Sequence, residues 1–483
     1  MTINEWSDAT AMAEAVQNKT VSPLELVEAT IREAERTNPK INAIVNQRYE
    51  KALVEAETRD FSNKPFAGVP IFLKDLGQEQ AGEPSTAGSR LFTSYHAKET
   101  DNYVKKLEEL GFIILGRSST PEFGFKNISD AQIHGPVNLP GDVTRNAGGS
   151  SGGAAALVSS GICPLAPASD GGGSIRIPAS FNGLIGLKPT RGRIPVGPIS
   201  FRGWQGASVQ FALTKTVRDT SRLLYHMQTC QMESPFILPK LNKVSLEQAV
   251  RPLKIAFSTV SPIGGKVSES AIKATKKAAR ALENLGHQVH EISDQPLNGI
   301  EAMQSYYIMN SVETAAMFDG IEAGLGRSMI IEDMELMTWA IYQSGQKIPA
   351  KVYSKILAQW DLYSHQMAVF HEAYDILLTP TVADVAPKHG QFALSESLQS
   401  KLKHIADYEW EKQQELIWDM FADSLDWTPF TQQANLTGQP SISLPVYRNA
   451  EGLSLGIQLT AAKGREDLLL QLAKQMEEGS VFS

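Results

Sequence analysis

The residues with the clearest chemical potential are a lysine and three serines set among glycines. Lys74 ends the apolar run VPIFL, and Ser150, Ser151 and Ser174 stand in the segments GGSSGG and SDGGGS. A serine hydroxyl is a weak nucleophile until a neighbouring base takes its proton. Desolvation at the end of a buried strand would disfavour the charged form of the lysine, lower its pKa and leave a neutral amine able to act as that base. These residues supply the groups of a Ser–Lys acyl-transfer site.

The glycines around these serines are concentrated far beyond the chain average. Residues 148–173 hold eight glycines in 26 residues, whereas the average of 37 in 483 predicts about two. A flexible Gly/Ser linker has such a composition, but the apolar segment AAALVSSGICPLAPA, which is typical of a helix and a strand, separates the two glycine clusters. We therefore expect ordered loops, with the N–H groups of Gly171, Gly172 and Gly173 placed to form an oxyanion hole around an attacked carbonyl.

Alternating apolar and amphipathic segments predict the elements that position these residues. Ser22 is a good N-cap, Pro23 suits the first helical position and Glu25 completes a capping box, so a helix begins at Pro23. Strands and helices alternate over most of the chain, which favours an α/β fold. The expected strands lie at 68–75, 112–116, 253–259, 287–292, 375–382, 440–447 and 453–460. The further helices are expected at 101–110, 268–285 and 465–479, and the segment 306–371 is helical in character.

Composition excludes several classes of protein. The 483 residues carry 45 Lys and Arg against 53 Asp and Glu, a net charge of −8, so we expect no nucleic-acid partner. Cys163 and Cys230 form no Cys-x-x-Cys pair, and neither a histidine metal motif nor a Gly-rich phosphate loop occurs, so we expect no metal and no cofactor. The N-terminus lacks the pattern of a signal peptide, and no run approaches the ~18 apolar residues of a spanning helix. We expect a cytoplasmic protein without membrane contact.

Four segments together resemble the motifs of the amidase signature family: GVPIFLKD with Lys74, GGSSGG at 148–153, SDGGGSIRIPAS at 169–180 and GLIGLKPTRGR at 183–193. The spacing also matches, with 76 residues from Lys74 to Ser150 and 24 from Ser150 to Ser174. Weaker similarity extends from the N-terminal helices to NLTGQPSISLPVY and GREDLLLQLA, so the resemblance covers nearly the whole chain. Within the family, the pattern is most similar to stand-alone bacterial amidases of the 6-aminohexanoate cyclic-dimer hydrolase type.

The resemblance implies an α/β fold, the amidase signature fold, in which helices cover both faces of a large mixed β-sheet. Length alone would suggest about three domains, but the motifs span the middle of the chain without a linker. We therefore expect a single amidase domain over 1–483. Its expected parts are N-terminal helices at 1–60, a signature core at 145–198 and a helical region lining the pocket at about 300–372.

Roles for individual residues also follow from the resemblance. Ser174 corresponds to the nucleophile that forms an acyl-enzyme, Ser150 to the bridging serine after a cis peptide bond, and Lys74 to the terminal base. The N–H groups of residues 171–174 correspond to the oxyanion hole. This Ser–cis-Ser–Lys triad implies hydrolysis of the C–N bond of a small linear or cyclic carboxamide, without a cofactor, to a carboxylate and an amine or ammonia.

Several neighbours of the triad are expected to support it. Ser151 is more often structural than catalytic and would contribute hydrogen bonds near the relay. Asp170 and Arg176 flank the nucleophile and are expected to brace its loop as a charge-assisted pair. Asp75 is expected to cap or orient the neighbouring backbone.

Gly171 stands where the family usually has Thr, Ile or Val. This departure would either loosen the oxyanion loop or leave space for a bulkier substrate. Trp204, Phe123 and Phe125 are candidates for substrate contact, although single aromatics are more often core or rim residues. Substrate specificity is expected to arise from the segments 120–135, 200–210 and 300–345.

Three alternatives remain open. GGSSGG also satisfies G-x-S-x-G, the nucleophile elbow of α/β-hydrolases, but residues 136–149 make a poor strand before Ser150, and that fold leaves Lys74 unexplained. The chain could instead be the glutaminase subunit of an aminoacyl-tRNA amidotransferase, although RSSTPEFGF at 117–125 is more similar to stand-alone amidases. It could also be a catalytically silent binding protein of the same fold.

The expected partner is a small-molecule amide, and a homodimer is the default oligomeric state.

Overall fold

The computed structural model describes residues 8–293 and 295–483, and its centre is an eight-stranded mixed sheet. The strand order is β10-β9-β11-β13-β12-β7-β8-β6. The pairs β10–β9 and β9–β11 are parallel, and the other neighbouring pairs are antiparallel. The strands are β6 (Leu165–Asp170), β7 (Ile185–Lys188), β8 (Val209–Thr214), β9 (Lys254–Phe257), β10 (Gln288–Glu291), β11 (Ile376–Pro380), β12 (Ser441–Arg448) and β13 (Ser454–Ala461).

A second sheet brings the predicted lysine next to the large one. It has the order β1-β3-β2, with strands β1 (Ile44–Gln47), β2 (Pro70–Lys74) and β3 (Ile113–Ser118). Strand β2 lies beside β6, so Lys74 at its end meets the strand that leads into the second glycine cluster. The predicted strand at 68–75 is confirmed, and its apolar residues are buried on both sides.

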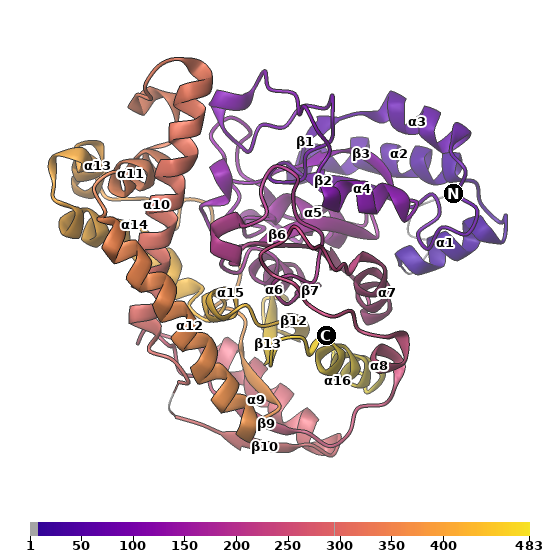
Figure 1. Cartoon of the computed structure of the whole chain (residues 1–483). Coiled ribbons are helices and arrows are strands. Elements are labelled where there is room, and N and C mark those ends of the chain that lie inside the picture. The colour runs from indigo at the N-terminus through magenta and orange to yellow at the C-terminus, as the bar shows by residue number, and fades with distance from the viewer. Residues whose placement is uncertain (1–7, 294) are drawn as a thin grey trace.

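Helices cover both faces of the sheet, as predicted, and gather in two groups at opposite sides of the molecule (Figure 1). The N-terminal group contains α1 (Ala9–Gln17), α2 (Pro23–Ile41), α3 (Tyr49–Thr58) and α4 (Asn102–Glu109). The opposite group contains α10 (Gly299–Leu325), α11 (Leu336–Gly345), α12 (Ala350–Ala373), α13 (Glu396–Lys403) and α14 (Trp410–Trp427). The remaining helices are α5 (Gly152–Ser159), α6 (Arg176–Asn182), α7 (Val217–Met227), α8 (Lys243–Glu247), α9 (Glu269–Asn284), α15 (Gln432–Thr437) and α16 (Glu466–Glu478).

Most of the predicted elements are confirmed, and two local predictions are wrong. The capping box at the start of α2 is present, with Ser22 and Glu25 bonded to each other's backbone N–H. The N-terminal segment is not wholly helical, because Asn42 ends α2 in the left-handed region and β1 then pairs with β3. Residues 142–146, expected to be a poor strand, form β5 (Asp142–Asn146). This strand pairs with β4 (Asn138–Leu139) in a separate hairpin that ends before the glycine cluster, so it does not build a nucleophile elbow.

One hydrophobic core joins the two sheets, with members from Ala9 to Val481. Smaller apolar clusters lie among α10, α11, α13 and α14, and between α10, α12 and the large sheet. Within residues 8–293 and 295–483, no helix is long and apolar enough to cross a membrane. The cytoplasmic location stays a prediction.

Candidate active site

Lys74 is completely buried at the end of β2, where its side chain meets two serines. Its Nζ donates hydrogen bonds to Ser150 Oγ at 2.7 Å and to Ser169 Oγ at 2.9 Å. Burial lowers the pKa of Lys74 to about 7, and the negative charge of Asp170 only partly opposes this shift. A substantial fraction of the amine is therefore neutral near neutral pH, as a general base requires.

Ser150 lies in the loop between β5 and α5, and the peptide bond that precedes it, Gly149–Ser150, is cis. Its side chain is nearly buried and faces Lys74. The next residue, Ser151, directs its hydroxyl to the backbone of β6, donating to Ser169 O at 3.2 Å and accepting from Ser169 N at 3.4 Å. Ser151 therefore ties the first glycine cluster to the strand that leads into the second.

The second glycine cluster forms the loop between β6 and α6 and carries Ser174. Asp170 Oδ1 accepts the N–H of Gly173 at 2.8 Å, so this N–H is already engaged within the loop. The N–H groups of Gly171, Gly172 and Ser174 form no hydrogen bond to other residues in the described part of the chain. These three groups, rather than that of Gly173, are therefore free to stabilise an oxyanion.

The expected ion pair between Asp170 and Arg176 is present and completely buried. Arg176 Nε and Nη2 donate to Asp170 Oδ2 and Oδ1 at 2.9 and 2.8 Å, the bidentate geometry typical of strong charge-assisted pairs. Burial alone would raise the pKa of Asp170, but Arg176, Lys188 and Asn435 outweigh it and hold the pKa well below its usual range. The carboxylate is therefore a fixed negative anchor for the loop.

Two residues near the C-terminus complete this support, and sequence reasoning missed both. Asn435 Nδ2 donates to Asp170 Oδ1 at 2.8 Å and to Asp170 O at 3.0 Å, and Thr431 Oγ1 donates to Gly172 O at 2.6 Å. They lie about 260 residues from the loop in the chain. Only the short stretch of family similarity at NLTGQP, which contains Asn435, hints at this contact.

Ser169 is a further polar neighbour of the lysine that sequence reasoning missed. It begins the motif SDGGGS and lies in β6, a strand whose other residues are mostly apolar. A polar residue at the end of such a strand was the available signal. Asp75, by contrast, has its predicted role, since its carboxylate binds the N–H and hydroxyl of Thr86 in the following loop.

One predicted contact is not formed in this structure. Ser174 and Ser150 line the same cavity, but the Ser174 hydroxyl forms no hydrogen bond with any residue in the ranges 8–293 and 295–483. The structure thus brings Lys74 and Ser150 into direct contact and places Ser174 beside them without closing the relay.

The space beside Gly171 is occupied. A Cβ atom on Gly171 would lie 2.9 Å from both Cε3 and Cζ3 of Trp204. The suggestion that Gly171 leaves room for a bulkier substrate is therefore wrong, because the Trp204 ring fills that room. Because the Trp204 ring packs against Gly171, the loop that contains Gly171 is not expected to be loosened either.

The serines open into a cavity of about 620 Å³, within the usual range for small-molecule sites. Each predicted specificity segment contributes, but the contribution of the helical region is restricted to the middle of α10. The apolar part of the lining includes Leu76, Phe92, Phe123, Phe125, Trp204 and Met317.

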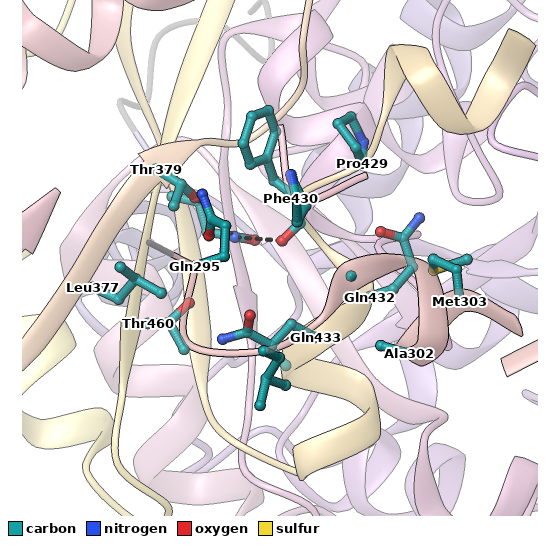
Figure 2. Close-up of a pocket in the computed structure, with 15 residues that line it drawn as sticks. Gln295, Ala302, Met303, Leu377, Thr379, Pro429, Phe430, Gln432, Gln433 and Thr460 are labelled. Carbon is teal, nitrogen blue, oxygen red and sulfur yellow. Dashed lines mark hydrogen bonds between the residues drawn. The ribbon is translucent and has the colours of Figure 1, made fainter. Parts of the chain in front are cut away.

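A second cavity lies between the start of α10 and the segment that leads into α15, and its size excludes a substrate. Figure 2 shows it among Gln295, Gln432, Gln433, Thr379 and Thr460, next to Phe430, whose carbonyl accepts a hydrogen bond from Gln458. Its volume of about 30 Å³ is close to the share of one water molecule in the liquid. Within the described ranges, no group of three or more His, Cys, Asp or Glu could hold a metal ion.

The fold and the site define the class of protein. The family model described as Amidase matches residues 25–470, so the chain belongs to the amidase family, and its fold is the amidase signature fold. The chain is an amide hydrolase, which acts on carbon–nitrogen bonds other than peptide bonds.

Particular relatives are similar over nearly the whole chain. A lipoamidase of Enterococcus faecalis is 37% identical over 98% of this chain, which spans 63% of that protein's length. A 6-aminohexanoate-cyclic-dimer hydrolase of a Pseudomonas species is 32% identical over 98% of this chain and 95% of its own. A solved structure of 6-aminohexanoate cyclic dimer hydrolase complexed with substrate superposes with a TM-score of 0.90 at 31% identity, covering 99% of this chain and 97% of that chain.

Proposed function

We propose that this amidase hydrolyses the C–N bond of a small carboxamide through Ser174, Ser150 and Lys74, by way of an acyl-enzyme. The observation that carries the proposal is the 2.7 Å contact between Lys74 Nζ and Ser150 Oγ, in the cavity that Ser174 also lines. A buried lysine with a pKa of about 7 supplies the base that a serine nucleophile needs.

In the proposed reaction, neutral Lys74 accepts the proton of Ser150 while Ser150 accepts the proton of Ser174. Ser174 Oγ forms a bond to the carbonyl carbon, and the carbonyl oxygen becomes an oxyanion held by the N–H groups of Gly171, Gly172 and Ser174. The proton then returns from Lys74 through Ser150 to the nitrogen, the C–N bond breaks, and the amine or ammonia leaves. Water attacks the ester by the reverse route and releases the carboxylate and free Ser174.

The relay requires the Ser174 hydroxyl to donate to Ser150 when substrate is bound. Catalytic hydrogen bonds are often long or misaligned in unliganded enzymes and shorten in the substrate complex. The fixed ion pair of Asp170 with Arg176 supports such a complex, because it holds the loop that carries Ser174. We also propose that residues 1–483 form one domain, supported by the core that runs from Ala9 to Val481.

The test is Ser174→Ala in the purified chain, without tRNA or a partner protein. A screen of aliphatic, aryl, peptide-terminal and cyclic amides for released amine identifies a substrate, and Ser174→Ala then lowers kcat by about 10⁴-fold or more. The melting temperature should stay within a few degrees of the wild-type value. Undiminished turnover by the variant would overturn the proposal.

The same purified chain separates the alternatives. Activity without partners argues against a subunit of an aminoacyl-tRNA amidotransferase. Covalent labelling of Ser174 by a serine-reactive phosphonate, absent in Ser174→Ala, argues against a silent binding protein. The homodimer stays a prediction, which the mass of the purified protein in solution tests directly.

A further inference from the structure

Two aromatic residues of the cavity wall have an unusual backbone conformation. Phe123 and Trp204 both have φ of 49°, and Gln205 follows with φ of 54°. Such positive values are uncommon for residues other than glycine, and bulky residues keep them only where their surroundings hold them in place. They cluster at functional sites. Contacts with the surrounding residues must therefore stabilise the backbone conformation of Trp204.

Three contacts hold the turn that carries Trp204. Gln205 Nε2 donates to Glu313 Oε1 of α10 at 2.8 Å, and Arg191 Nε donates to Gly206 O at 2.7 Å. Asn435 Nδ2 donates to Ala207 O at 3.0 Å, and the same amide group binds the base of the oxyanion loop. One side chain thus fixes the Trp204 turn and the oxyanion loop to each other.

The ring of Trp204 contacts both the loop that carries Gly171 and a second aromatic ring. It fills the space that a side chain at Gly171 would need, 2.9 Å from the Cβ position. It also stacks on Phe125, with ring centroids 6.1 Å apart and planes inclined by 8°. Tyr306 meets it edge-on at 6.1 Å. Both Trp204 and Phe125 line the substrate cavity.

We propose that Trp204 determines substrate specificity: its ring takes the place of a side chain at residue 171 and, with Phe125, forms a flat aromatic wall that binds an unbranched aliphatic or aryl arm of the amide. The inference rests on the proposed function, since the arm belongs to the amide that Ser174 attacks. Glu313, the carboxylate that binds the Trp204 turn, is engaged by Gln205 and Tyr353 and is therefore not free to hold a polar arm. The faces of the Trp204 and Phe125 rings offer a large apolar area, which favours an apolar arm.

The first experiment compares acetamide with hexanamide. Four additional methylene groups on the wall should raise kcat/KM for hexanamide over acetamide by on the order of 100-fold in the wild type. Trp204→Ala should lower this ratio at least tenfold, because the arm loses its wall. Trp410→Ala, at the start of α14 and away from the cavity, should leave the ratio unchanged. An unchanged ratio in Trp204→Ala, with both amides slowed equally, would overturn the proposal.

The second experiment is a double-mutant cycle that needs no substrate preference. Gly171→Thr alone should lower the melting temperature and slow every amide, because its Cβ meets the Trp204 ring. In the Trp204→Ala background, Gly171→Thr should cost much less, since the ring is gone. Equal damage in both backgrounds would show that Trp204 does not occupy the place of that side chain, which would contradict the proposal.

Binding separates this inference from the proposed function. Hexanamide binding to Ser174→Ala, which cannot acylate, should be at least tenfold tighter than binding to Ser174→Ala/Trp204→Ala. If the wild type hydrolyses no amide but this difference in affinity persists, the proposed function is contradicted and the proposed role of Trp204 is supported. If amides are hydrolysed and the difference in affinity is absent, the role of Trp204 is contradicted and the proposed function is supported.

Discussion

Lys74 Nζ lies 2.7 Å from Ser150 Oγ and has no carboxylate within salt-bridge distance among the described residues. Among the residues that the structure describes, its one other side-chain partner is Ser169, also a neutral hydroxyl. The negative charge that opposes the lowering of the Lys74 pKa is that of Asp170, which is paired with Arg176. The fold therefore buries a lysine without a counter-ion, and this arrangement makes the neutral amine accessible near neutral pH.

Activity should follow the titration of Lys74. Because burial lowers its pKa to about 7, the amine is protonated and inactive below that pH, and neutral and active above it. We expect kcat to rise through the region of pH 7 and to level off above it. Lys74→Met should lower kcat by about 10³-fold, within the range for loss of a general base. The measurement is a pH–rate profile with the best substrate of the amide screen.

Lys74→Arg provides the matched control, because it keeps a positive charge but cannot be deprotonated in this pH range. It should be as inactive as Lys74→Met. A rate that does not vary between pH 5.5 and 8 would contradict the lysine-base mechanism, as would high activity in Lys74→Arg.

Ser169 should act as a positioning residue for the lysine. Its hydroxyl accepts a hydrogen bond from Lys74 Nζ, and such a bond favours the protonated amine. Ser169→Ala should therefore shift the rise in activity to lower pH and reduce kcat by about tenfold, the equivalent of one hydrogen bond. Ser208→Ala is the control, since Ser208 lines the same cavity but does not contact the lysine. A pH profile identical to the wild type would show that Ser169 does not tune Lys74.

The sequence predicted the parts of the site that lie within continuous motifs. Ser174 and Ser150 stand in glycine clusters, and Lys74 ends an apolar strand, so local pattern was enough to find them. Most of the strands also followed from local signals, because buried strands are apolar runs. The contact of β2 with β6, which unites Lys74 with Ser169, joins residues almost 100 positions apart and has no local signature.

The same limit applies to Gly171. The sequence suggested empty space beside Gly171, because this residue has no side chain. Only the tertiary packing shows that the ring of Trp204 fills that space. Asn435 is a comparable case: its amide group binds Asp170 and the turn after Trp204, two segments that are distant from it in the chain. Short-range periodicity carries no information about such contacts.

The Asp170–Arg176 pair should be a major determinant of stability. Arg176→Met would leave the Asp170 carboxylate buried without its partner and would remove the donors to Thr431 O and Gln458 Oε1. Loss of one partner of a buried ion pair typically costs about 3–5 kcal/mol. We expect the free energy of unfolding in urea to fall by that amount, with loss of activity.

An exposed ion pair serves as the comparison. Lys273 pairs with Glu269 on α9, and the Lys273 side chain is 64% exposed. Lys273→Met should change the free energy of unfolding by less than about 1 kcal/mol. If Arg176→Met is equally mild, the buried pair does not hold the loop as we infer.

Gly173 should be sensitive to a single methyl group. Its φ is +132°, a conformation that L residues rarely adopt, and an added Cβ would lie 2.3 Å from Thr431 Oγ1, which donates to the neighbouring carbonyl of Gly172. Gly173→Ala should therefore displace the loop that carries the proposed oxyanion donors and lower kcat by about 10²-fold or more, with a smaller change in KM. Gly264→Ala is the control, because Gly264 has φ of +80° but nothing within 4 Å of the added atom. This variant should lower the free energy of unfolding by about 1–3 kcal/mol, through backbone strain alone, and leave kcat unchanged. If the two variants have the same kcat, the geometry of this loop does not limit the reaction.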